Sequence, residues 1–310
     1  MLVFKPIASD MQNLIRGYTF KYGEGSCQHS FVSSFCLAPK YGDMFCEHEG
    51  FLYTLRSKLC DEKFSVYLFP HGDKNDLQAV KNAVQNILDD AHANNSRVKF
   101  VTLTKNSVEL IFKLFPEKFT AINDRDRAEY ICDFNAQVHI QGSKLAVKRN
   151  KINGFLRKYG DNFSVSLIKN EHIEEIRAFQ KRWLSEKFLQ NNDPYHIAQL
   201  KNEDNGIQIA LDNFFDIGLS GVVAFINGEM CGYAYGAPLS DDFFDAIVGK
   251  GDRNFLNIHR VLNWEFVKHC CQGYKYINYE EDLGFKGLRT RKTEDKPDFL
   301  IEKYIVTENE

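Results

Sequence analysis

Three acidic residues followed by a basic, glycine-containing stretch form the part of the sequence that is richest in reactive side chains. Glu280, Glu281 and Asp282 end a β-branched and aromatic segment, and four cations follow within about ten residues. A strand end holds side chains rigidly, and the loop after it can wrap a ligand. We therefore expect a site here for an anionic, amine-bearing substrate.

Glu280 and Asp282 are the candidate catalytic pair of this segment. Residues two apart on an extended strand point to the same side, so the two carboxylates could jointly orient or deprotonate an amino group. That step belongs to acyl transfer, which also requires stabilisation of an oxyanion. The alternative is that the acids form ion pairs with Lys286, Arg289 or Lys292 and stiffen the loop.

Neighbouring residues are candidates for binding the substrate. Asn278 could hydrogen-bond it directly. Arg289 and Lys292 share a face if Gly287 begins a helical turn, so they could grip one phosphate or carboxylate, unless they are solvated surface residues. Gly284 and Gly287 could supply a positive φ or a close approach of backbone to ligand, or be plain turn glycines.

A basic segment near the middle of the chain is a second candidate binding surface. Residues 142–158 include six cations and no acid, and their apolar residues predict an amphipathic helix over 143–158. From this helix, Lys148, Arg149 and Asn153 could contact tRNA or an anionic head group. The alternative is a solvated helix between domains.

Two further glycines, Gly249 and Gly251, lie in a predicted loop over 249–253, between a predicted strand over 243–248 and a predicted helix over 255–271. Backbone N–H groups at such a helix start can hold a pyrophosphate, which makes the two glycines candidates for binding acyl-CoA. An acid within the loop and the lack of a third glycine argue against that use.

Strands and helices alternate along the chain, which predicts an α/β fold with mixed sheets. The 310 residues suit two domains, which we place at 1–142 and 143–310, the second including the basic helix. The main expected elements are strands over 30–37, 64–69, 98–103 and 299–306, a helix over 77–93 capped by Asp76, and a hairpin of 221–226 and 230–237 around Asn227-Gly228.

Composition excludes several classes of protein. The formal net charge of -3 argues against a general nucleic-acid binder, although a local basic patch could still bind one. The eight cysteines lack the spacing of a zinc site, and the chain start lacks the features of a signal peptide, so we expect reduced thiols, no metal and a cytoplasmic location. No run of residues is apolar for long enough to predict a transmembrane segment.

Three segments together resemble a known family: residues 127–131, 144–155 and 278–289. They are similar to the soluble proteins related to the C-terminal domain of phosphatidylglycerol lysyltransferase, and the likeness covers most of the chain in the same order. The resemblance implies two tandem GNAT-like acyltransferase domains. It also implies kinship with enzymes that move an aminoacyl group from aminoacyl-tRNA to a lipid or peptidoglycan acceptor.

The leading hypothesis for function is therefore aminoacyl transfer from aminoacyl-tRNA to an amine or hydroxyl on a small molecule or a lipid head group. One alternative is an N-acyltransferase that uses acyl-CoA. The other is a non-catalytic module that binds tRNA or an anionic ligand. His259 and Trp183 are interpreted as packing residues in each case.

Overall fold

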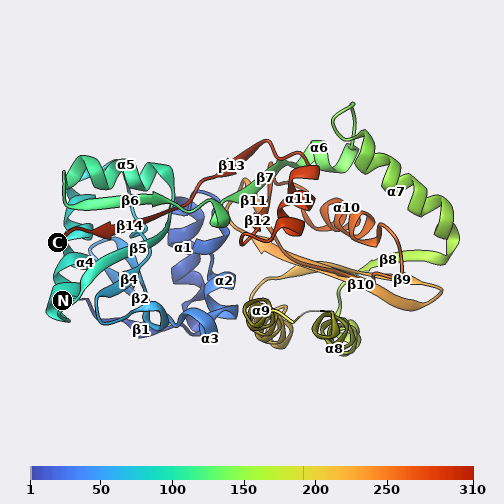
Figure 1. The fold of residues 1–310 in the computed structure, drawn as a ribbon, viewed down its shortest axis with the longest axis horizontal. Helices are drawn as coiled ribbons and strands as arrows, with labels where there is room; N and C mark the ends of the chain where they lie inside the picture. The colour runs from blue at the N-terminus through green and yellow to red at the C-terminus, as the bar shows by residue number, and fades with distance from the viewer. Residues whose placement is uncertain (1, 191) are drawn as a thin grey trace. The chain divides into compact units, whose positions relative to one another are not determined.

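The computed structural model describes residues 2–190 and 192–310 and divides them into two compact units (Figure 1). Unit 1 contains the chain up to Glu129 together with Glu281–Phe285 and Leu300–Glu310, and unit 2 contains Tyr130–Glu280 and Lys286–Phe299. The chain thus passes from unit 1 to unit 2 after Glu129, ahead of the boundary expected at 142/143. It then returns to unit 1 twice, which the predicted division did not include.

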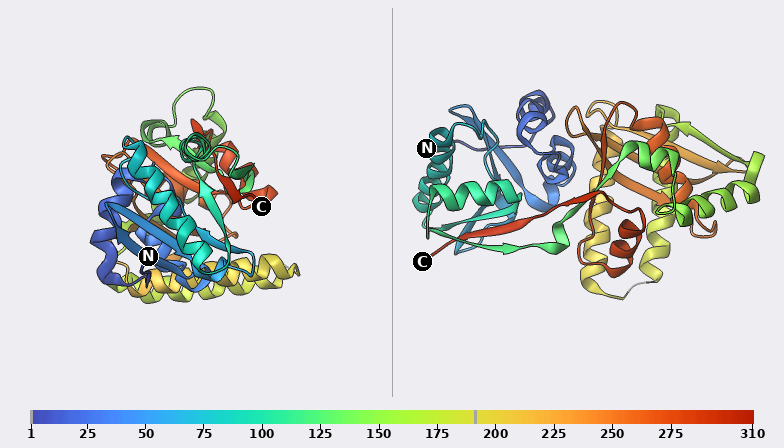
Figure 2. Two further views of the ribbon diagram at one scale, coloured as in Figure 1. Left: turned by 90° about the vertical axis from the view of Figure 1, so that its left-hand side faces the viewer. Right: turned by 90° about the horizontal axis from the view of Figure 1, so that it is seen from above.

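Unit 1 is built on a seven-stranded mixed sheet with the order β1-β2-β3-β4-β5-β14-β6. Strands β4 and β5 are parallel, and the C-terminal strand β14 lies antiparallel between β5 and β6, as the red strand beside the green one in Figure 2 shows. The strands are β1 (Lys5–Pro6), β2 (Asp43–His48), β3 (Phe51–Arg56), β4 (Phe64–Tyr67), β5 (Arg97–Leu103), β6 (Phe119–Asn123) and β14 (Tyr304–Glu308).

Helix α4 (Leu77–Ala93) covers one face of this sheet and confirms the predicted helix and its cap. The Asp76 carboxylate accepts hydrogen bonds from the backbone N–H groups of Gln78 and Ala79 at 3.1 and 3.0 Å. The buried apolar side chains of α4 pack with aromatic residues of β3 to β5. The other helices of unit 1 are α1 (Gln12–Tyr22), α2 (Phe31–Cys36), α3 (Ala38–Tyr41) and α5 (Lys105–Leu114).

The strand predicted over 30–37 is wrong, because this segment forms α2. The Ser30 hydroxyl accepts a hydrogen bond from the Ser33 N–H at 3.0 Å, which caps the helix and outweighs the strand preference of its aromatic and β-branched residues.

Unit 2 is built on a second seven-stranded sheet, with the order β13-β7-β12-β11-β10-β9-β8. The hairpin of β9 and β10 turns at Asn227 and Gly228, whose φ angles of 53° and 81° fit the predicted two-residue turn. The strands are β7 (Glu129–Asp133), β8 (Phe163–Leu167), β9 (Ser220–Ile226), β10 (Glu229–Pro238), β11 (Phe243–Gly251), β12 (Tyr276–Glu281) and β13 (Phe299–Ile301). The strand predicted over 299–306 is therefore two strands, β13 and β14, in different sheets.

Helices cover both faces of the unit 2 sheet, with α8 and α9 side by side on one face and α10 and α7 on the other (Figure 1). The helices are α6 (Phe134–His139), α7 (Ala146–Tyr159), α8 (Ile173–Leu189), α9 (Pro194–Asp212), α10 (Ile258–Cys270) and α11 (Lys286–Glu294). The basic segment predicted as a helix is α7. Among the described residues, none of the helices has both the length and the apolar character that crossing a membrane requires.

Each unit contains a strand, helix and parallel strand connection: β4-α4-β5 in unit 1 and β11-α10-β12 in unit 2. Strand β11 pairs with β12 through Phe243–Asp245, whereas its pairing with β10 continues to Gly251. The parallel strands β11 and β12 therefore diverge beyond Asp245. Ligand sites of α/β proteins commonly lie at the carboxyl ends of parallel strands.

Candidate functional site

The acidic strand end that the sequence singled out is divided between the two units. Asn278 and Glu280 belong to unit 2, and Asp282 belongs to unit 1. The extended geometry expected for the acidic pair is wrong, since Glu280 has a φ of 57° and β12 ends at Glu281. Asn278 is fully buried, and its side-chain oxygen accepts a hydrogen bond from the Glu280 N–H at 2.7 Å, which shapes this turn.

Asp282 is fully buried in unit 1 and stabilises a turn there. One carboxylate oxygen lies 3.3 Å from Nη1 of Arg125, and the other accepts a hydrogen bond from the Gly284 N–H at 2.9 Å. Gly284 has a φ of 77°, and a Cβ at this position would lie 2.8 Å from an Asp126 carboxylate oxygen. The turn therefore needs glycine, and one cation that pairs with Asp282, Arg125, comes from far upstream in the sequence.

Helix α11 carries the two cations proposed to grip an anion. Arg289 and Lys292 lie three residues apart in this helix, so the shared face predicted for them is present, and Gly287 lies in its first turn. Lys292 is nearly buried at 9% exposure, with Nζ 6.0 Å from the ring centroid of Tyr130, whereas Arg289 is half-buried.

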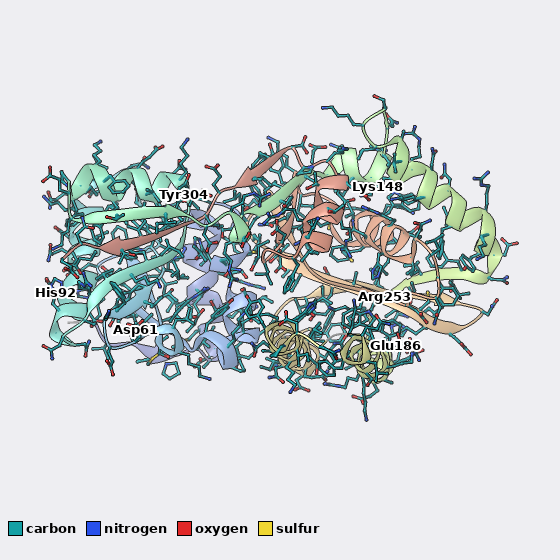
Figure 3. The ribbon with its side chains drawn as sticks, viewed as in Figure 1. Asp61, His92, Lys148, Glu186, Arg253 and Tyr304 are labelled. Atoms are coloured by element: carbon teal, nitrogen blue, oxygen red, sulfur yellow. The ribbon has the colours of Figure 1, made fainter. Side chains whose placement is uncertain are left out.

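Lys148 lies in a buried ionic cluster of unit 2 (labelled in Figure 3). Its Nζ is 3.0 Å from an Asp295 carboxylate oxygen and also donates a hydrogen bond to the side chain of Gln137. Arg260 of α10 donates to the same Asp295 oxygen at 2.8 Å. These contacts join α7 and α10 to the residue that follows α11.

Arg149 and Asn153, the other candidates on α7, have different surroundings. Arg149 donates hydrogen bonds from Nη1 to the carbonyl oxygens of Ile140 and Gly142 at 2.7 and 3.1 Å, which holds the segment before α7. Asn153 is exposed and lines a hollow of about 600 Å³ together with Asn150, Leu156 and Arg157.

Gly249 and Gly251 lie in β11, so the prediction of a loop from residue 249 is wrong. The two glycines pair with Ala234 and Gly232 of β10, which extends the strand to Gly251. A Cβ on Gly251 would lie 2.9 Å from Cγ2 of Ile258 and 3.3 Å from Nδ1 of His259. Gly251 therefore allows the first turn of α10 to approach the strand closely.

Four cations that were not predicted as site residues lie around the junction between the end of β11 and the start of α10. They are Lys187 on α8, Lys250 on β11, Arg253 before α10, and Arg291 on α11. Lys250 and Lys187 both stack on the indole of Trp183, with Nζ 4.1 and 4.9 Å from the ring centroid. Arg253, labelled in Figure 3, donates a hydrogen bond from Nη1 to the side-chain oxygen of Gln190 at 2.7 Å.

The combined field of these cations acts on His259 in the first turn of α10. Burial, followed by the charges of Arg291, Lys250, Lys187 and Arg253, lowers the pKa of His259 to about 3, so the imidazole is neutral at physiological pH. Burial and the charges of Arg253 and Lys250 likewise lower the pKa of Lys187 to about 8.

Positive charge is in excess at this junction. Lys250 pairs with Glu203 at 2.7 Å, but within residues 2–190 and 192–310 neither Lys187 nor Arg291 forms an ion pair. Trp183 is 9% exposed, and its Nε1 has no hydrogen-bond partner among the described residues. We call Lys187, Lys250, Arg253 and Arg291 the cation cluster; their guanidinium and ammonium groups suit a phosphate or another anion.

Part of the cation cluster could have been predicted from the sequence. Lys250 and Arg253 flank Gly251, which was already a candidate, and Lys187 lies four residues after Trp183 on one helix. Arg291 lies between Arg289 and Lys292 on α11, and its position in the sequence does not distinguish it from these two cations. The interpretation of Trp183 as a packing residue agrees with its burial, although the indole also carries two ammonium groups.

Comparison with known proteins identifies relatives of this chain. Residues 20–307 match the family described as phosphatidylglycerol lysyltransferase, C-terminal. A conserved protein of unknown function from Bacteroides thetaiotaomicron has a similar structure, with a TM-score of 0.91, 26% identity and full coverage of both chains. No curated protein matches the sequence.

Two more distant structures show the fold. The structure of L-PGS from Bacillus licheniformis aligns with a TM-score of 0.65 and 15% identity over 96% of this chain and 91% of that one. A tandem GNAT protein from the clavulanic acid biosynthesis pathway aligns with a TM-score of 0.50 and 8% identity over 99% and 98%. The predicted α/β fold of two GNAT-like domains is confirmed.

Proposed function

This chain belongs to the phosphatidylglycerol lysyltransferase C-terminal family, and from that premise we propose that it transfers an aminoacyl group from aminoacyl-tRNA to an amine or hydroxyl acceptor. Membership of the family and the GNAT-like fold support an acyltransferase in general. The identity of the donor rests on the cation cluster.

The excess of positive charge at the β11-α10 junction is the observation that carries the proposal. Lys187 and Arg291 are half-buried and form no ion pair within the described part of the chain, and the charges of Glu203 and Asp295 offset theirs only in part, since the pKa of each cation is still lowered. Holding the two cations there therefore costs free energy, which a bound anion would reduce. The acceptor end of tRNA carries one phosphate per nucleotide, and several cations can hold such a backbone without reading its sequence. Uncharged acyl donors would leave these cations unmatched.

Glu280 is our candidate for the proton-accepting group. It lies at the end of β12, where this strand has diverged from β11, and it is half-buried. The acceptor nitrogen or oxygen would attack the ester carbonyl and pass its proton to the Glu280 carboxylate. The tRNA 3′ oxygen would then leave and take up a proton, giving an amide or ester and uncharged tRNA. We assign Asp282 to shaping the following turn.

Binding residues complete this scheme. We propose that Arg291 and Lys187 hold a donor phosphate, while Arg289 of α11 and the exposed Arg253 widen the positive surface around it and the nearly buried Lys292 adds its charge from inside unit 2. Gly251 holds the first turn of α10 close to β11, beside these cations. Asn278 sets the conformation at Glu280 through its hydrogen bond. Lys148 and Arg149 act indirectly, since their contacts position α7.

The test is the discharge of aminoacyl-tRNA. Purified protein is mixed with tRNA charged with each amino acid in turn, with a small-molecule extract of cell lysate as the source of acceptors. We expect faster loss of at least one aminoacyl group than with a Glu280→Gln variant. Failure to discharge any charged tRNA above the spontaneous rate would count strongly against the proposal.

An acyl-CoA donor is the second candidate, and the position of Gly251 favours it. The glycine brings β11 against the first turn of α10, a place where a helix start can hold a pyrophosphate. Coenzyme A should then raise the melting temperature of the wild-type protein and not that of a Gly251→Val variant. If tRNA and coenzyme A both bind but neither donor is consumed above its spontaneous rate, the chain is a non-catalytic binding module.

A further inference from the structure

Unit 1 contains a group of buried polar side chains that the proposed function does not use. Along β3, Tyr53 packs into the core beneath α4, while Thr54 and Arg56 lie at alternate positions and so face the opposite side of the sheet. His29, in the short helix Cys27–His29, and His71, after β4, are buried as well.

His29 and His71 form a close pair. Their ring centroids are 4.7 Å apart with the planes at 75°, and the residues are 7% and 3% exposed. Both ring nitrogens of His29 and Nδ1 of His71 have no hydrogen-bond partner among the described residues. Buried polar groups are almost always hydrogen-bonded, so each such nitrogen calls for an explanation.

The pair lies where a parallel sheet commonly binds a ligand. His71 follows the carboxyl end of β4 and pairs through its backbone with Leu52 of β3, and Thr102 lies at the carboxyl end of the neighbouring parallel strand β5. Thr102 has a φ of 57°, which is unusual for a β-branched residue, and its buried hydroxyl also lacks a partner in the described part of the chain. Strained backbone of this kind concentrates at functional sites.

The cations near the pair each form an ion pair with a carboxylate, whereas Lys187 and Arg291 of unit 2 form none within the described residues. Lys303 pairs with Glu129 at 2.8 Å, Lys74 with Glu24 at 2.5 Å and Arg56 with Asp43 at 3.4 Å. Burial and the nearby positive charges hold the pKa of both histidines well below the usual range, so the rings are neutral. The neutral histidines therefore offer N–H donors close to the ammonium groups of Lys74 and Lys303, which favours an anionic acceptor over a metal cation.

We propose that His29 and His71 bind the carboxylate of a small molecule at a second site, in unit 1. A carboxylate has two acceptor oxygens, and each neutral imidazole supplies one N–H, so the pair can hold both oxygens. The site is separate from the cation cluster and does not depend on the proposed transfer reaction.

The test is NMR of ¹⁵N-labelled histidine side chains in the full-length protein, titrated with acetate and with free amino acids. The ring resonances of His29 and His71 should shift saturably with at least one of these carboxylates. The affinity should fall at least tenfold in His29→Leu and in His71→Leu, while His48→Gln, on the same unit and half-exposed, should bind as the wild type does.

Stability separates a binding role from a structural one. His29→Leu removes two buried nitrogens without partners, so the melting temperature of the ligand-free protein should stay the same or rise. The proposal is overturned if no carboxylate shifts the two rings, if inorganic phosphate or Zn²⁺ binds more tightly than every carboxylate, or if both leucine variants bind normally. A large drop in the melting temperature of His29→Leu, together with no ring shifts in the wild type, would assign the pair to packing.

Discussion

The two units present different chemistry at the same kind of backbone junction. In unit 1 the carboxyl ends of β4 and β5 lie near neutral histidines, and the cations around them are paired with carboxylates. In unit 2 the junction of β11 and α10 lies near Lys187 of α8 and Arg291 of α11, which form no ion pair within the described residues. In the two proposed sites, a repeated strand, helix and strand connection sets the position of the ligand, and the side chains set the charge that it must carry.

The first prediction concerns the contribution of a buried carboxylate to the free energy of unfolding in each unit. Glu129 and Lys303 are both fully buried, and Glu129 also accepts hydrogen bonds from Ser26 and from the Cys27 N–H at 2.9 and 3.1 Å. Glu129→Gln should lower the free energy of unfolding by about 3–5 kcal/mol, because it leaves a buried ammonium without its charge partner. Urea unfolding measures this.

The matched variant in unit 2 is Asp295→Asn. This variant removes the carboxylate that pairs with the buried Lys148, but Lys148 keeps its hydrogen bond to Gln137 and Arg260 keeps an ion pair with Glu294, so we expect a smaller loss of about 2 kcal/mol. Equal losses in both variants would contradict the view that unit 1 balances its charges pair by pair.

The second prediction uses two glycines of β11. Gly251→Ala places a Cβ 2.9 Å from Ile258 and should cost about 1–3 kcal/mol of stability while moving the first turn of α10 away from the cation cluster. A Cβ on Gly249 would have no atom within 4 Å, so Gly249→Ala should change the free energy of unfolding by less than about 0.5 kcal/mol. Thermal unfolding and tRNA binding should separate the two variants. Equal behaviour would show that the close approach at Gly251 is unimportant.

The third prediction is a difference in pH dependence between the two junctions. The pKa of Lys187 is lowered from 10.5 to about 8, so anion binding in unit 2 should weaken by up to about tenfold from pH 7 to pH 9 as this lysine loses its proton. Carboxylate binding in unit 1 should stay flat over the same range, because its histidines are neutral throughout. Titrations at several pH values would show this contrast.

The sign of the stability effect follows from the same shift. Between about pH 8 and 10.5 the unfolded chain binds more protons at Lys187 than the folded one, so the free energy of unfolding should rise with pH in that range. Lys187→Gln should remove this contribution. A wild-type protein whose anion affinity is constant from pH 7 to 9 would exclude Lys187 from the site.

Much of the fold could be predicted from local patterns. The helix after Asp76, the Asn227-Gly228 hairpin and the alternation of strands and helices all depend on residues close in sequence. The return of the chain end to unit 1 could not be predicted, because β14 pairs with β5 and β6, which lie far away in the sequence. The helix α2 was missed because one serine cap outweighed the strand preference of its segment.

The candidate site was harder to predict than the fold. The acids were recognised by their density, but whether an acid binds a ligand or a cation depends on partners such as Arg125, which come from distant segments. The cation cluster joins residues of α8, β11 and α11, so no sequence spacing reveals it. Burial of a charged residue is also hard to predict. The charge of Lys148 suggested a position on the surface, but the structure buries this side chain inside unit 2.

The most direct test of the central claim, that the excess cations of unit 2 hold the anionic part of the donor, is the equilibrium binding of aminoacyl-tRNA at fixed salt. The variant Lys187→Gln/Arg291→Gln should bind roughly a hundredfold more weakly than the wild type. The control Lys181→Gln, an exposed lysine on the same helix α8, should stay within about twofold. Equal weakening in the double variant and the control, or none in either, would contradict the account.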